Sequence, residues 1–148
     1  MKTIQKYKLE LVRESEHEYL PSSRISEPED VFRTLESVFE LSKQPEELFV
    51  ILAMTTAGTI AGAFEISHGD LNTAIVNPRE VFKRAMLVNA NSIILAHNHP
   101  SGELKPSLND KTLTSRLVEC GKILGITVMD HLIVGGGCYH SMKEEGDM

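Results

Sequence analysis

The stretch of sequence that decides the fold runs from Ile93 to Gly102 and reads I-I-L-A-H-N-H-P-S-G. Its first four residues are apolar, which is typical of a buried central strand, and Pro100 and Gly102 then turn the chain. Successive strand residues point to opposite faces, so His97 and His99 share one face. The sequence therefore predicts two neighbouring imidazoles at the end of a core strand.

A helix is predicted to follow this turn, because Ser107 and Asp110 have the spacing of a capping box. Asp110 then lies in the first turn of the helix, where its carboxylate can approach the two histidines. Three protein ligands of these types, with a position left open for water, are typical of a catalytic zinc site. Each part alone has a simpler explanation. Paired histidines are common at surfaces and in cores, and the serine and aspartate could only cap the helix.

Apolar periodicity outward from this stretch predicts strands that alternate with helices. Two further helix starts carry capping residues, namely Ser26 with Glu29, and Asn77 followed by Pro78 with Glu80 at the third helical position. The pattern is typical of a mixed α/β fold, in which a mixed β-sheet is flanked by about three helices. Strands are expected at 4–12, 47–55, 60–68, 71–76, 93–96 and 126–134, with a short one after 137.

The composition is that of one ordinary globular domain. The chain has 148 residues, of which 41% are hydrophobic and 24% are charged. We therefore expect a single domain over residues 1–148, with its core at about 26–140. Lys and Arg total 15 against 21 Asp and Glu, which gives a net charge of −6. Because proteins bind duplex DNA largely through cationic groups at its phosphates, strong autonomous DNA binding is not expected.

No segment has the features of a signal peptide or of a membrane span. The longest apolar run, Leu48–Met54, is far shorter than the roughly 20 residues that a spanning helix needs. Cys120 and Cys138 do not form a C-x-x-C motif and are expected to be reduced thiols. We expect a soluble cytoplasmic protein with no membrane partner, and the sequence indicates no oligomeric state.

The H-N-H-P-S-G stretch followed by S-x-x-D resembles the JAMM motif of the JAB/MPN metalloproteases. Within that superfamily the sequence is most similar to the bacterial RadC branch, and the similarity runs from about Ser26 to Val134. Full-length RadC proteins carry an N-terminal helix-hairpin-helix segment, which we expect this sequence to lack. The matching segments are N-P-R-E-V-F-K-R-A at 77–85, H-N-H-P-S-G at 97–102 and D-H-L-I-V at 130–134.

Carried over by position, the resemblance implies a JAB/MPN-like fold and a zinc ion bound by His97, His99 and Asp110. It implies that Ser107 helps to hold the oxyanion or the metal-bound water. It also implies an upstream glutamate on a strand, which acts on that water as general base.

Glu65 is the best candidate for this general base. On a regular strand it shares a face with Ala63 and Ser67, whose small side chains leave room for a metal ion. Asp70 and Glu80 are competitors, although Glu80 is more simply explained as the capping partner of the second helix.

Asp130 and His131 are a further pair that the resemblance singles out. As successive strand residues they point to opposite faces, so they cannot both face the metal. His131 could donate a hydrogen bond to a ligand or line the substrate groove, and Asp130 could orient a ligand. A purely structural hydrogen-bonding pair is an equally good explanation.

The predicted function is zinc-dependent hydrolysis of a peptide or isopeptide bond by activated water, with a peptide or protein as substrate. One alternative is a nucleic-acid-associated module, as the DNA-repair label of the RadC family suggests. The negative net charge and the absent helix-hairpin-helix segment disfavour it. The other alternative is a non-catalytic scaffold, like JAB/MPN domains that have lost ligands. The presence of three ligands and the serine disfavours that alternative.

Overall fold

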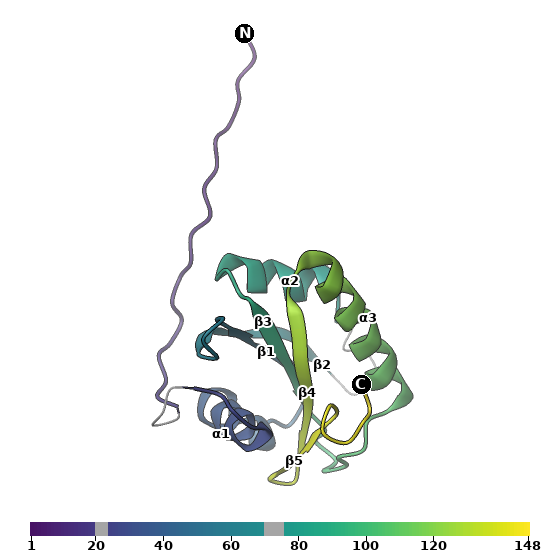
Figure 1. The fold of residues 1–148 in the computed structure, drawn as a ribbon. Coiled ribbons are helices and arrows are strands. Elements are labelled where there is room, and N and C mark those ends of the chain that lie inside the picture. The colour runs from purple at the N-terminus through teal and green to yellow at the C-terminus, as the bar shows by residue number, and fades with distance from the viewer. Residues whose placement is uncertain (20–23, 70–75) are drawn as a thin grey trace.

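The computed structural model describes residues 1–19, 24–69 and 76–148 (Figure 1). Its strands form one five-stranded mixed sheet in the order β2-β1-β3-β4-β5, in which only β3 and β4 are parallel neighbours. The predicted mixed α/β fold is confirmed. The strands are β1 (Glu47–Met54), β2 (Ile60–Gly69), β3 (Ser92–Asn98), β4 (Thr127–Gly135) and β5 (Cys138–Ser141). The helices are α1 (Pro28–Phe39), α2 (Pro78–Leu87) and α3 (Leu108–Leu124), with a short 3-10 helix, η1 (Leu41–Lys43).

The helices cover opposite faces of this sheet (Figure 1). Alternate residues of β1 separate the core into two parts, because Phe49 and Ile51 pack with α2 and α3 whereas Val50 and Leu52 pack with α1. We call these the α2/α3 face and the α1 face. Since both faces are covered, β1 is an almost continuous apolar run.

Helix α3 connects β3 to its parallel neighbour β4, as a parallel pair requires. Gly125 ends this helix in the left-handed conformation with φ 73°, which is the conformation predicted for a terminal glycine. Gly121 lets α3 approach the sheet, because a Cβ atom there would lie 2.3 Å from the carbonyl oxygen of Ile126. The first turn of α3 lies beside the C-terminal end of β3, where Asp110 is 3.3 Å from His97.

The predicted helix starts are confirmed at α2 and α3 and shifted at α1. Asn77 caps α2, because its side-chain oxygen accepts the amide of Arg79 at 3.0 Å. Helix α1 begins at Pro28, and Glu27 rather than Ser26 is its N-cap. The predicted partner of Ser26 is Glu29, but the observed partner is Asp30. Its Oδ2 accepts hydrogen bonds from the amide and from the hydroxyl of Ser26, each at 2.9 Å.

The strand predicted at 4–12 is wrong. Residues 1–19 have no assigned helix or strand, and the N-terminal part of this segment extends away from the sheet (Figure 1), with the large side chains of Tyr7 and Leu9 exposed. At its other end the Glu18 carbonyl oxygen accepts the Ser37 hydroxyl of α1 at 2.8 Å. The alternation of apolar and polar residues fits a strand, but an extended segment becomes a strand only by pairing with another. The strand predicted at 71–76 lies almost entirely outside the described residues. None of the described helices has the length and apolar composition needed to cross a membrane.

Candidate metal centre

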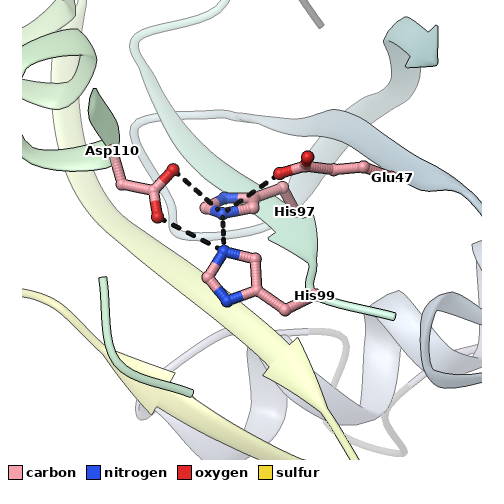
Figure 2. A group of neighbouring side chains, drawn as sticks. All are labelled: Glu47, His97, His99 and Asp110. Carbon is pink, nitrogen blue, oxygen red and sulfur yellow. Dashed lines mark hydrogen bonds and ion pairs between the residues drawn. The ribbon is translucent and has the colours of Figure 1, made fainter. Parts of the chain in front are cut away.

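The structure brings together the three residues predicted as metal ligands (Figure 2). His97 and His99 lie at the end of β3 with their Nε2 atoms 3.0 Å apart. Asp110, from the first turn of α3, directs one carboxylate oxygen at each ring, at 3.3 Å from His97 Nε2 and 3.3 Å from His99 Nε2. His97 is 1% exposed, so this cluster lies at the edge of the core rather than on the surface.

Glu47 is the fourth member of the cluster, and the sequence reasoning missed it. Its Oε1 lies 3.7 Å from His97 Nε2, and the ligand atoms of all four residues lie within 4.8 Å of one another. Its position follows from strand pairing. Phe49 is the register partner of His97, and Glu47, two residues earlier, projects from the same face. One available signal was that Glu47 is the only charged residue of β1.

Glu65, the predicted general base, is not brought to the histidines. It pairs with Val50, whose side chain packs on the α1 face, and its own side chain is 52% exposed. A β-bulge between Phe49 and Val50 shifts the register of β2, so that Phe49 pairs with Ser67. Glu65 therefore shares a face with Ala63 but not with Ser67, because a bulge interrupts the alternation that the prediction assumed.

Of the two competitors of Glu65, only Glu80 lies among the described residues, and it is not in the cluster. Asp70 falls outside the described residues. Glu80 forms ion pairs with Lys83 and Arg84, each at 2.8 Å, instead of completing a capping box with Asn77. Hydrogen bonds from these two cations lower the pKa of Glu80 to about 2.

The cap of α3 also fixes the orientation of the Asp110 carboxylate. The Ser107 hydroxyl oxygen accepts the amide of Asp110 at 3.0 Å, and Asp110 Oδ2 accepts the amide of Ser107 at 2.8 Å. The S-x-x-D sequence can be explained as a helix cap or as a source of a metal ligand. The two explanations are compatible, because the Asp110 carboxylate both caps the helix and faces the histidines. Because the Ser107 oxygen is the acceptor in the bond from the Asp110 amide, the hydroxyl proton of Ser107 remains available for donation.

Asp130 and His131 point to opposite faces of β4, as predicted. His131 is fully buried, and its Nε2 lies 2.7 Å from His97 Nδ1. Asp130 does not face the cluster. Its carboxylate accepts the Ser141 hydroxyl at 2.6 Å and the Lys143 amide at 3.1 Å, and so holds the turn after β5.

The cluster has the geometry and the donor set of a divalent-cation site. Ligand atoms at 2.0–2.1 Å from one tetrahedral ion lie roughly 3.3 Å apart. The three shortest separations found, 3.0, 3.3 and 3.3 Å, are close to that spacing. His99 also donates its Nδ1 proton to the carbonyl oxygen of Glu103 at 2.6 Å, which leaves the lone pair of a neutral ring on Nε2.

The electrostatics of the site likewise favour positive charge at its centre. The hydrogen bond to Asp110 raises the pKa of His99, because the carboxylate stabilises a proton on the ring. Burial raises the pKa of Asp110, but hydrogen bonds from His97 and His99 outweigh it and hold the pKa well below its usual range. Burial raises the pKa of Glu47. A cation placed between these groups would replace the protons that they otherwise share.

Comparison with known proteins supports the same interpretation. Residues 25–147 match the RadC-like JAB domain family. The chain is 44% identical over 126 residues to a UPF0758 protein of Methanosarcina mazei, covering 85% of this chain and 54% of that protein. It is 49% identical over 121 residues to a UPF0758 protein of Alkaliphilus oremlandii, covering 82% of this chain and 51% of that protein. The chain thus spans about half the length of the curated relatives it matches. A match over this much of the sequence shows that the chain belongs to the RadC-like JAB domain family.

Proposed function

We propose that this protein is a zinc-dependent hydrolase that cleaves an amide bond of a peptide or protein, with His97, His99 and Asp110 holding the ion. The observation that carries the proposal is the approach of two imidazole Nε2 atoms to 3.0 Å, each also 3.3 Å from an oxygen of Asp110. Zinc is the ion we propose because it is bound in proteins by imidazole nitrogens and carboxylate oxygens, and catalytic sites use three protein ligands. Membership of a JAB domain family supports the choice.

Zinc held there supplies Lewis-acid activation and lowers the pKa of water to about 7. Glu47, rather than Glu65, is the residue we propose as general base. Its carboxylate would accept a proton from the attacking water and pass that proton to the leaving nitrogen. The burial that raises its pKa suits this role, because a general base works best with a pKa near the working pH.

Ser107 is the residue we propose to stabilise the oxyanion. Its oxygen already accepts the Asp110 amide, so the hydroxyl proton can be donated to the substrate carbonyl oxygen as negative charge develops. Because Ser107 is also the N-cap of α3, Ser107→Ala changes both stability and rate. Ser107→Thr retains a hydroxyl at the cap and is the matched control.

Metal analysis of protein purified without a His-tag tests the proposal, followed by a peptide-library cleavage assay. We expect one zinc ion per chain, and cleavage that is lost with a chelator and restored by zinc. Protein that takes up no zinc when zinc is supplied would contradict the proposal. Zinc binding without cleavage of any library member would instead favour the scaffold alternative.

We further infer that the chain does not bind DNA tightly by itself. The net charge is −6, and neutralisation of phosphates supplies most of the affinity of non-specific DNA binding. Fluorescence anisotropy with duplex and branched DNA at several salt concentrations measures this. Weak binding that falls steeply with salt is expected, whereas nanomolar binding near physiological salt would favour the nucleic-acid-associated alternative.

A further inference from the structure

A chain of buried polar groups lies behind the proposed ligands and links α3 to β3 through β4. The Thr114 hydroxyl lies 2.7 Å from the carbonyl oxygen of Asp110 and 2.6 Å from His131 Nδ1. The other ring nitrogen of His131 lies 2.7 Å from His97 Nδ1. Thr114 and His97 are each 1% exposed and His131 is 0% exposed. Nothing in the proposed hydrolysis uses Thr114 or His131, yet each of their side-chain polar atoms is bonded.

The direction of these hydrogen bonds is fixed from the Thr114 end. A carbonyl oxygen can only accept, so the single hydroxyl proton of Thr114 is donated to Asp110. The hydroxyl oxygen then accepts a proton from His131 Nδ1. The His131 ring is fully buried and, within the described part of the chain, is bonded to the Thr114 hydroxyl and the His97 ring and to no carboxylate, so it is neutral and carries one proton only. The remaining nitrogen, Nε2, is therefore an acceptor.

This acceptor determines which nitrogen of His97 carries a proton. His131 Nε2 can only be satisfied by the Nδ1 proton of His97, so a neutral His97 ring has its lone pair on Nε2. That atom faces Asp110, Glu47 and the other histidine. Phe49 packs on both rings, with centroids 5.9 Å from His97 and 5.4 Å from His131, and restricts their rotation.

We propose that Thr114 and His131 are positioning residues, which hold His97 as the Nδ1-protonated tautomer with its Nε2 lone pair directed at the metal position. Thr114 contacts both sides of the site, because it bonds to the Asp110 backbone one helical turn away and to His97 through His131. Outer hydrogen-bond partners of metal ligands orient those ligands and tune their affinity. This inference rests on the proposed metal site but assigns a role to residues that do not bind the ion.

The experiment measures zinc affinity and the His97 tautomer in Thr114→Val, Thr114→Ser and His131→Phe. Affinity is measured with Zn²⁺ alone, in competition with a chelator. The tautomer is measured by ¹⁵N NMR of the imidazoles in zinc-free protein at alkaline pH. We expect Thr114→Val and His131→Phe to bind zinc about 10–100-fold more weakly and to show mixed tautomers of His97. Thr114→Ser should retain both properties, because it keeps the hydroxyl.

The chain offers a matched control on the other face of the sheet. Thr34 is also 1% exposed and also donates its hydroxyl to the carbonyl four residues earlier, that of Asp30, at 2.8 Å. Thr34→Val therefore removes the same kind of helix hydrogen bond, and we expect unchanged zinc affinity. The inference is wrong if Thr34→Val lowers the zinc affinity as much as Thr114→Val does. It is also wrong if Thr114→Val leaves both the zinc affinity and the His97 tautomer unchanged.

The tautomer measurement separates failure of this inference from failure of the proposed function. Wild-type protein that binds no zinc would overturn the proposed function and the role in metal binding together. A His97 ring that is protonated on Nε2 in zinc-free wild type would overturn the positioning role even if zinc binds.

Discussion

The two faces of the central sheet differ in what their buried polar side chains are bonded to. On the α1 face, Asp130 is met by donors of the chain itself, including the Ser141 hydroxyl and the Lys143 amide. On the α2/α3 face, the outer nitrogens of His97 and His99 face each other and the Asp110 carboxylate. Donors satisfy a carboxylate on the first face, whereas two imidazole nitrogens and a carboxylate converge on one point on the second. Only the second arrangement is suited to a cation.

Two glutamates on the adjacent strands β1 and β2 show the same difference between the two faces. Glu47 projects from the α2/α3 face with a side chain that is 14% exposed, next to His97. Glu65 projects from the α1 face of the edge strand β2 and is 52% exposed. Residue type is therefore a poor guide to function here. The face of the sheet determines which carboxylate can take part in the site.

The largest effect is expected from His99→Ala, which removes a ligand from the α2/α3 face. We expect loss of stoichiometric zinc, a larger effect than the roughly 10–100-fold that loss of an outer partner costs. The fold should survive, because His99 lies beyond the last residue of β3. Mass spectrometry of metal content and circular dichroism measure the two outcomes. Full zinc content in the variant would show that the ligand set is misassigned.

The second-largest effect is expected on the hydrolysis rate, and it distinguishes Glu47 from Glu65 as the general base. Glu47→Gln should lower the rate of amide hydrolysis by about 10²–10⁴-fold, because an amide cannot accept the proton of the attacking water. Zinc should be retained, since three ligands remain. Glu65→Gln is the matched variant on the other face, and its rate should equal that of wild type. The library substrate found for wild type serves both assays, and the reverse result would restore Glu65 as the base.

A smaller effect, chiefly on stability, is expected from Asp130→Ala on the α1 face. The substitution leaves the Ser141 hydroxyl and the Lys143 amide without their acceptor, and each unsatisfied buried group costs about 1–3 kcal/mol. The free energy of unfolding should fall accordingly in a denaturant titration. Zinc affinity should fall far less than in His99→Ala, because Asp130 faces away from the cluster and reaches it only through the His131 amide, which it accepts at 2.7 Å. A loss of zinc comparable to that of His99→Ala would mean that the two faces are not independent.

The smallest effect is expected from Glu80→Gln, which alters neither face of the sheet. Its ion pairs with Lys83 and Arg84 are partly exposed and lie outside the cluster, so zinc content and cleavage rate should be unchanged and the melting temperature should fall only slightly. These cations lower the pKa of Glu80 from 4.5 to about 2 in the folded state. Its contribution is therefore present above pH 4.5 and lost as the pH falls through about 2. Thermal melts of both proteins should converge over that range.

Local sequence determined much of this protein. The common face of His97 and His99 follows from the two-residue repeat of a strand, and the orientation of Asp110 follows from a cap formed with Ser107. Both features involve residues at most three positions apart, where backbone geometry leaves few alternatives. The mixed α/β fold and the cap of α2 were predictable for the same reason.

Only the tertiary structure decided which glutamate lies beside the two histidines. Glu47 reaches His97 because β1 is the neighbour of β3 in the sheet, with Phe49 paired to His97, 48 positions away, and no local pattern encodes that pairing. Glu65 is turned away because a bulge in β2 interrupts the alternation of its side chains. Thr114 and His131 meet because α3 packs on β4. Long-range pairing and packing depend on which elements bury one another's apolar surfaces, and that is a property of the whole chain rather than of any segment.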